Sequence, residues 1–196
     1  VDLACGPAER VFLSTGTTQG AAMRSRHLMP DLRLYRSSAV AAMRTYLFPD
    51  VPRMRLVSLF PPVSILHDSS LAQMISWAFE SFGGEGSRIV SDGAGIDFET
   101  LVELLRDSEK DGEPCCLLTT TGALVFVLDW AREHDLTFRL PHGSRLMDTG
   151  GDKGAPRRLS RRGLLHACWN TFGLPSYFCV NEYGMAELSS QFFDNV

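Results

Sequence analysis

Residues 114–134, PCCLLTTTGALVFVLDWAREH, contain the two patterns that decide the fold predicted here. Residues 114–120 form a brief apolar run that begins at a proline, which is typical of a buried β-strand. Residues 122–134 are too long for an average strand and predict a helix. Because a strand that leads straight into a helix cannot be joined to the next strand by a hairpin, we expect a parallel neighbour reached by a crossover.

The same alternation of strand and helix extends through the rest of the sequence. Other short apolar runs predict strands at residues 10–14, 54–60, 87–91 and 176–180. Apolar residues at helical spacing predict helices at residues 32–47, 71–82, 98–105 and 159–172. We therefore predict an α/β fold in which helices cover both faces of a largely parallel sheet. Ligands of such folds bind in the loops at the carboxyl ends of the strands.

Composition and charge exclude several classes of protein. The 196 residues suffice for one large core, and 44% apolar with 21% charged residues is an ordinary globular composition. The formal charge of −4 predicts no binding to nucleic acid, and the apolar runs are too short to span a membrane. The five cysteines lack the spacing of a metal site, which predicts reduced thiols in a cytoplasmic protein.

A loop of hydroxyl and glycine residues follows the first predicted strand. Residues 14–20 read STGTTQG, and glycines there would let successive backbone amides point toward phosphate oxygens. The spacing of a Walker loop is absent, which argues against simple kinases and GTPases. A turn that binds no ligand is the alternative interpretation.

A second candidate site follows the last predicted strand. Residues 181–187 read NEYGMAE. The ring of Tyr183 beside Gly184 offers a face on which a nucleobase can stack, and the carboxylate of Glu187 is suited to Mg²⁺. A core tyrosine and a solvated glutamate are the alternative.

Four stretches of the sequence together resemble a known superfamily. They are residues 14–18 (STGTT) with 24–27 (RSRH) close behind, residues 67–71 (HDSSL), residues 149–154 (TGGDKG) and residues 181–191 (NEYGMAELSSQ). In this order they resemble the motifs of the adenylate-forming ligases. Within that superfamily they are most similar to the acyl-protein synthetases, the long-chain fatty acid to protein ligases of the bacterial bioluminescence system. The resemblance implies that residues 1–196 are the central part of the large N-terminal domain, without the C-terminal lid domain.

The resemblance also implies a reaction in two steps. A carboxylic acid, expected to be a fatty acid, reacts with ATP and Mg²⁺ to give an acyl-adenylate and pyrophosphate. A thiol of a protein then accepts the acyl group, and an acyl reductase is a conceivable partner. Coenzyme A as the acceptor, in an aryl-CoA or acyl-CoA ligase, is one alternative. A nucleotide-binding remnant without catalytic activity is another.

Site residues follow from the resemblance position by position. Those expected to hold the phosphates are Ser14, Thr15, Gly16, Thr17 and Thr18, with Arg24 as a pairing cation. Those expected to contact the nucleoside or the acyl-adenylate are Gly150, Gly151, Asn181, Tyr183 and Gly184. Those expected to act in catalysis are Thr17, Lys153 and Glu187, with Glu187 also binding Mg²⁺.

Several positions depart from the superfamily, and Ala186 is the one expected to affect the reaction most directly. Ala186 stands where a threonine hydroxyl usually contacts the α-phosphate. Loss of one such donor commonly costs about two to three orders of magnitude in rate, so we expect reduced activity.

Overall fold

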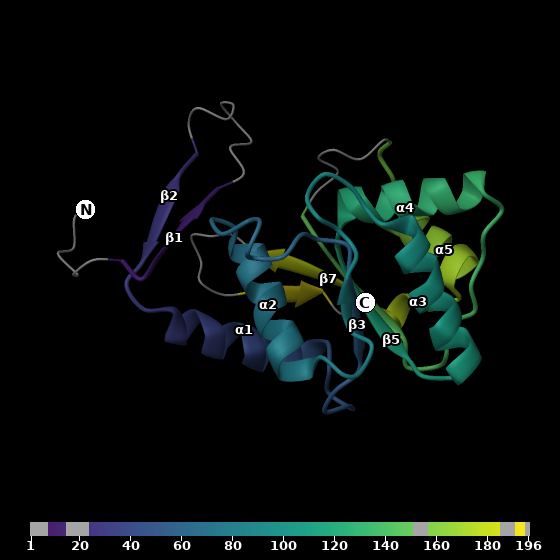
Figure 1. Ribbon diagram of the computed structural model, residues 1–196, viewed down its shortest axis with the longest axis horizontal. Helices are drawn as coiled ribbons and strands as arrows, with labels where there is room; N and C mark the ends of the chain where they lie inside the picture. Colours follow the sequence, from purple (N-terminus) through teal and green to yellow (C-terminus); the bar gives the residue numbers. More distant parts are fainter. Residues whose placement is uncertain (1–7, 15–23, 151–156, 185–190, 195–196) are drawn as a thin grey trace.

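A central sheet organises the computed structural model, which describes residues 8–14, 24–150, 157–184 and 191–194 (Figure 1). Six strands lie in the order β4-β3-β5-β6-β7-β8. Their bounds are Arg55–Ser58 (β3), Arg88–Ile89 (β4), Cys115–Thr120 (β5), Arg145–Thr149 (β6), Cys179–Gly184 (β7) and Gln191–Asp194 (β8). Neighbours from β4 to β7 run parallel, and β8 runs antiparallel to β7. The predicted α/β fold with a largely parallel sheet is confirmed.

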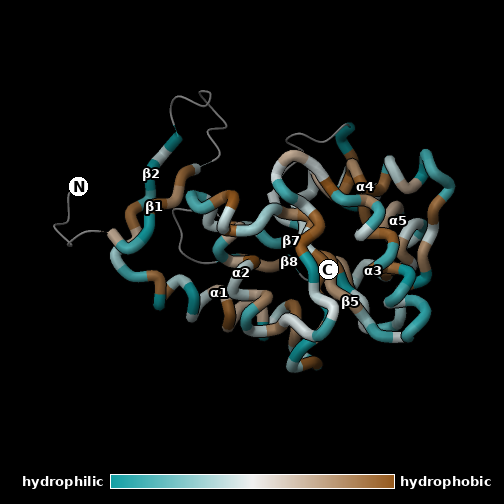
Figure 2. Tube along the Cα trace, viewed as in Figure 1, coloured by the Kyte–Doolittle hydropathy of each residue, from teal (hydrophilic) through white to brown (hydrophobic). Residues whose placement is uncertain are grey.

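Five α-helices connect the strands, each beginning after a polar residue. They are Leu32–Tyr46 (α1), Ser70–Phe82 (α2), Phe98–Asp111 (α3), Thr121–Glu133 (α4) and Arg161–Phe172 (α5). The side chains that accept a hydrogen bond from a first-turn amide are those of Asp31, Ser69, Asp97, Thr120 and Ser160. Hydrophobic and hydrophilic stretches alternate along the helices in Figure 2, as expected for helices with one buried face.

The sheet separates two hydrophobic clusters. Cys115 and Leu117 point into the cluster formed with α3, α4 and α5, whereas Cys116 and Leu118 point into the cluster formed with α1 and α2. This alternation follows from the two-residue period of a strand. Helices therefore cover both faces of the sheet, as predicted. No helix in the described part of the chain is long and apolar enough to cross a membrane.

The first predicted strand lies outside the parallel sheet. It is β1, Arg10–Leu13, which pairs antiparallel with β2, Arg26–Met29, in a separate two-stranded ribbon (Figure 1). The expectation that residues 14–20 follow a strand of the central sheet is therefore wrong. Apolar character at residues 10–14 indicated a strand, but nothing local distinguishes a ribbon strand from a sheet strand.

The start of one predicted strand is wrong, and three strands were not predicted. Residues 176–178 form a turn of 3₁₀ helix, so β7 begins three residues later than predicted. The analysis did not predict β2 or β8, and it also missed β6 because Arg145 and Asp148 interrupt its apolar run. Both charges are buried in ion pairs, Arg145 with Asp50 at 2.7 Å and Asp148 with Arg161 at 2.6 Å. The ion pairs offset the cost of burying these charges, and the linear sequence does not show which residues will pair.

Candidate functional site

Asp148 joins three elements at the carboxyl ends of β6 and β7. Its carboxylate is 1% exposed and accepts hydrogen bonds from Arg161 Nη1 at 2.6 Å, Thr121 Oγ1 at 2.8 Å and Asn181 Nδ2 at 3.1 Å. Arg161 begins α5, Thr121 begins α4, and Asn181 belongs to β7. One buried carboxylate therefore fixes the starts of two helices against two strand ends.

A second polar pair lies on the opposite face of the same two strands. Thr149 of β6 and Glu182 of β7 are partners in the register, and Thr149 Oγ1 donates a hydrogen bond to Glu182 Oε2. Glu182 is 4% exposed. Burial raises the pKa of Glu182 to about 7, although the hydrogen bond from Thr149 partly opposes this rise. The carboxyl group of Glu182 is therefore near its midpoint of titration at neutral pH.

The strands end in residues suited to contact a flat ligand. Gly150 follows Thr149 and Tyr183 follows Glu182, which are the last partners in the β6–β7 register, and Tyr183 pairs with Phe192 of β8. Tyr183 is 57% exposed. Gly150 has a φ of +79°, and no heavy atom of the described residues lies within 4 Å of the place where a Cβ would be. An exposed ring beside open space is an arrangement on which a nucleobase can stack.

Ser14 and Arg24 lie together next to the Leu13–Arg26 pair, where the chain leaves β1 and enters β2. The Ser14 hydroxyl accepts a hydrogen bond from the Ser25 amide at 2.9 Å, and the Ser14 carbonyl accepts one from Arg24 Nε at 2.7 Å. Arg24 also pairs with Asp68 at 3.1 Å. The guanidinium of Arg24 therefore already has a carbonyl and a carboxylate as partners. To bind phosphate as predicted, Arg24 would have to share its guanidinium with these two partners or exchange one of them for the phosphate.

Residues 67–71 connect the ribbon to the sheet. Asp68 contacts Arg24 of the ribbon. Two residues later, the Ser70 carbonyl accepts a hydrogen bond from the Tyr35 hydroxyl at 3.1 Å. Tyr35 is buried, and its pKa is raised first by burial and then by the nearby charge of Glu182. Arg24 thus pairs with Asp68 and Thr149 with Glu182, and Tyr35 donates to Ser70 and experiences the charge of Glu182.

Other predicted site residues lie outside the described part of the chain. They are Thr15, Gly16, Thr17, Thr18, Gly151, Lys153 and Glu187. Their assigned roles stay predictions. Within the described residues, no group of three or more His, Cys, Asp or Glu side chains is placed to hold a metal ion.

The sequence analysis missed several residues of this site. Asp148, Thr121, Arg161 and Tyr35 lie in elements that it treated only as parts of the scaffold. Glu182 lay inside a quoted motif but had no role assigned. A charged residue inside an otherwise apolar strand was the available signal, because such a residue is buried only when it is paired or neutral.

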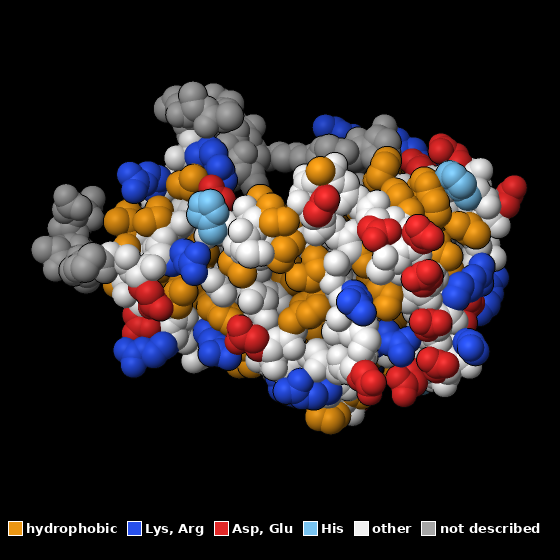
Figure 3. All heavy atoms as spheres, in the orientation of Figure 1, with side chains coloured by type: hydrophobic (Ala, Val, Ile, Leu, Met, Phe, Trp, Pro, Cys, Tyr) orange, Lys and Arg blue, Asp and Glu red, His pale blue; other side chains and the backbone are white. Residues whose placement is uncertain are grey.

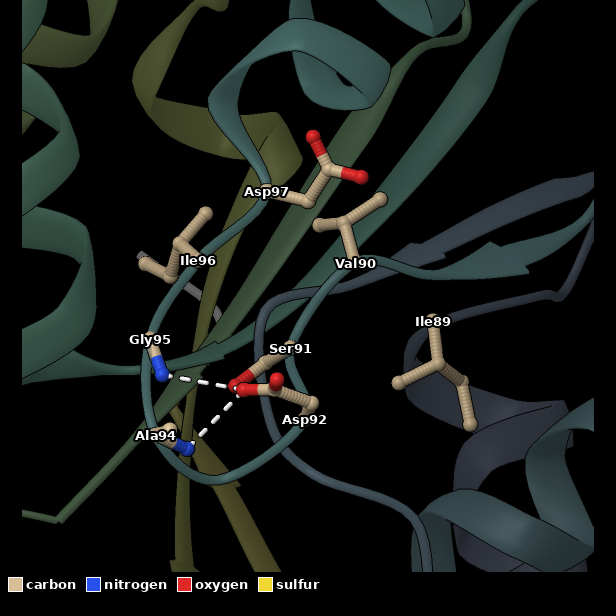
Figure 4. A pocket seen from close by; sticks show the side chains of 8 residues that line it. All are labelled: Ile89, Val90, Ser91, Asp92, Ala94, Gly95, Ile96 and Asp97. Carbon is tan, nitrogen blue, oxygen red and sulfur yellow. Dashed lines mark hydrogen bonds between the residues drawn. The ribbon is translucent and has the colours of Figure 1, made fainter.

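A separate hollow lies at the β4 edge of the sheet. Residues 89–97 line a cavity of about 420 Å³ (Figure 4). Asp92 Oδ1 accepts hydrogen bonds from the amides of Ala94 at 2.9 Å and Gly95 at 3.0 Å. These bonds shape the loop itself. On the face shown in Figure 3, basic and acidic side chains of the described residues are interspersed.

Comparisons with known proteins identify the fold. No family model and no curated protein matches the sequence. Among solved structures, coronafacic acid ligase from Pectobacterium brasiliense matches with a TM-score of 0.55 at 14% identity, over 88% of this chain and 29% of that chain. The fatty acyl-adenylate ligase from L. pneumophila, solved with acyl adenylate and pyrophosphate, matches with a TM-score of 0.58 at 11% identity, over 90% of this chain and 28% of that chain. McyG A-PCP, complexed with phenylalanyl-adenylate, matches with a TM-score of 0.55 at 13% identity, over 97% of this chain and 28% of that chain.

The chain shares the fold of a part of each of these three proteins. It spans less than a third of the length of each of these three proteins. At such low identity the comparisons establish the fold alone, and the chemistry must be argued from the site.

Proposed function

We propose that the chain is the central part of a ligase that uses ATP to activate a carboxylic acid as an acyl-adenylate. The observation that carries this proposal is the linkage of four motif stretches at one end of the sheet. Arg24 pairs with Asp68 and Thr149 with Glu182, and Tyr35 relates the two pairs through its hydrogen bond to Ser70 and the effect of the Glu182 charge on its pKa. The fold shared with structures that hold adenylates agrees with it.

The described residues fit an adenine nucleotide. The exposed ring of Tyr183 offers a stacking face, and the open space at Gly150 leaves room beside it. The amide of Asn181 is held by Asp148, which fixes the strand that presents Tyr183. Bound ATP would supply the adenylyl group that turns an unreactive carboxylate into a mixed anhydride. The chain's own contribution is to position the reactants and to stabilise charge on phosphate oxygens.

The roles of Ser14, Arg24 and residues 15–18 with the phosphates, and of Glu187 with Mg²⁺, belong to the same proposal. Hydroxyls and backbone amides suit phosphate oxygens, and a carboxylate oxygen suits a hard cation. The four cysteines among the described residues are unpaired thiols, which agrees with a reducing compartment such as the cytoplasm.

Transfer to a protein thiol is the finer part of the proposal. It rests on the resemblance of the four stretches to acyl-protein synthetases, which favours a long-chain fatty acid and an acyl reductase as partner. Transfer to coenzyme A is the second candidate, because the phosphate and YGM motifs are shared with aryl-CoA and acyl-CoA ligases. Ala186 in place of threonine favours a nucleotide-binding remnant as a third.

The proposal is tested by exchange of labelled pyrophosphate into ATP in the presence of Mg²⁺ and a panel of aromatic and fatty acids. We expect exchange that depends on the added acid and is lost in the Glu187→Gln variant. Nucleotide binding without exchange for any acid would favour the remnant. Acyl transfer to protein or to coenzyme A then separates the two ligases.

A further inference from the structure

Glu182 lies directly beneath the exposed end of β7. It is 4% exposed, whereas the following residue, Tyr183, is 57% exposed, because successive strand residues point to opposite sides. The Glu182 side chain folds back toward Gly184, since a Cβ at Gly184 would overlap Glu182 Oε1. The carboxyl group thus fills the space that a larger residue at position 184 would need.

Among the described residues, the groups that face this carboxyl are neutral. Thr149 of β6 donates to it, Gln191 of β8 pairs with Gly184 in the register, and the titratable group facing it from α1 is the hydroxyl of Tyr35. Within the described part of the chain, no cation lowers the pKa of Glu182. The Oε1 atom of Gln191 is buried and accepts no hydrogen bond from the described residues. These surroundings favour a protonated carboxyl group, which is uncharged and can donate a hydrogen bond.

We propose that Glu182 is a proton-dependent positioning residue, which holds Tyr183 and Gly184 in place for the ligand when its carboxyl group is neutral. The nature of the ligand, an adenylate, rests on the function proposed above. The positioning itself rests on the packing of Glu182 against Gly184.

Loss of the proton makes burial of the Glu182 carboxyl group unfavourable. An ionised carboxylate with one hydroxyl donor and no cation is costly to keep buried. It reaches water only when Gly184 and the β7–β8 pair move away from Tyr35 and Thr149. Burial raises the pKa to about 7, so this change falls in the neutral range of pH.

The positioning is tested in the ligand-free protein by hydrogen exchange of backbone amides in residues 179–184 and 191–194, corrected for the effect of pH on chemical exchange. We expect protection to fall between pH 6 and pH 8 in the wild type and to stay constant in Glu182→Gln, which keeps the shape but cannot ionise. Glu103→Gln removes an exposed glutamate from α3 and should behave as the wild type. Equal protection at both pH values in the wild type would overturn the proposal.

A second variant keeps the test decisive if Glu182→Gln does not fold. Thr149→Val removes the hydroxyl that stabilises the ionised form, so the pH midpoint of the loss of protection should move upward. An unchanged midpoint would also overturn the proposal.

Binding of a fatty acyl-sulfamoyl-adenosine, a stable analogue of an acyl-adenylate, separates this inference from the proposed function. We expect wild-type affinity to drop about fivefold from pH 7 to pH 8, as the neutral fraction of a group with a pKa of about 7 falls, and Glu182→Gln to bind equally at both. Affinity that does not depend on pH in the wild type would contradict the role of Glu182 toward the ligand. No binding at any pH, with pH-dependent protection intact, would refute the proposed function and leave the positioning supported.

Discussion

At the scale of single residues, Glu182 links stability to pH. Its pKa is about 7 in the folded chain against 4.5 ordinarily. Between these values the folded state keeps a proton that the unfolded state has lost, so the free energy of unfolding falls as pH rises and is constant above about 7. We expect a loss on the order of 3 kcal/mol between pH 4.5 and 7, absent in Glu182→Gln. Urea denaturation at pH 5 and pH 8 measures this loss in the wild type and in the variant. The same pH dependence in the variant would contradict the assignment of the raised pKa to Glu182.

Among the residues of the candidate site, we expect replacement of Asp148 to lower the free energy of unfolding most. Its replacement by asparagine leaves the buried end of Arg161 without a charged partner, which commonly costs about 3 kcal/mol or more. Thr121→Val removes one hydrogen bond to the same carboxylate and should cost about 1 kcal/mol. Chemical denaturation compares the two variants. Equal losses would show that the Asp148 network does not hold the carboxyl ends together.

Tyr183 should matter for binding and little for folding, because its ring is 57% exposed. Tyr183→Ala should weaken binding of the acyl-adenylate analogue roughly tenfold, as loss of a base stacking on an aromatic ring does, while Tyr183→Phe keeps the affinity. The control is Tyr177→Ala, since Tyr177 is 62% exposed on the 3₁₀ turn before β7. Calorimetric titration measures the three affinities. Full affinity in Tyr183→Ala would exclude stacking on this ring.

At the scale of elements, two glycines that end helices offer a matched comparison. Gly112 after α3 and Gly173 after α5 have φ values of +70° and +72°. A Cβ at position 112 meets no heavy atom within 4 Å, whereas one at position 173 meets Arg139 Cδ at 3.4 Å. Gly112→Ala should therefore cost about 1 kcal/mol for the left-handed backbone alone, and Gly173→Ala more. Thermal unfolding ranks the variants, and a larger loss at Gly112 would contradict this explanation.

Helices could be predicted better than strands because the sequence signals of a helix lie close together along the chain. Caps such as Ser69 and Asp97, and apolar residues at helical spacing, lie within a few positions of one another in the sequence. The placement of β1 depends on its partner β2, and that of β6 depends on ion pairs that Arg145 and Asp148 form with distant residues. Long-range partners of this kind leave no local signal.

At the scale of the whole molecule, the alternation of strand and helix patterns predicted an α/β fold with a largely parallel sheet, and the structure confirms it. Asn181, Tyr183 and Gly184 of the candidate site were predicted and lie at the carboxyl end of β7. The buried carboxyl of Glu182 was not, because its environment comes from α1, β6 and β8. Residues that face a ligand belong to a motif that the sequence shows. Residues that hold those motif residues in place can be identified only when the fold is known.

The central claim is that an adenylate binds where the described motif stretches meet. Changes in backbone amide chemical shifts on adding the acyl-sulfamoyl-adenosine test it most directly. We predict the largest changes at residues 120–122, 148–150 and 181–184, with residues 89–97 around the separate cavity unchanged. Changes centred on residues 89–97, or none anywhere at saturating ligand, would contradict the account.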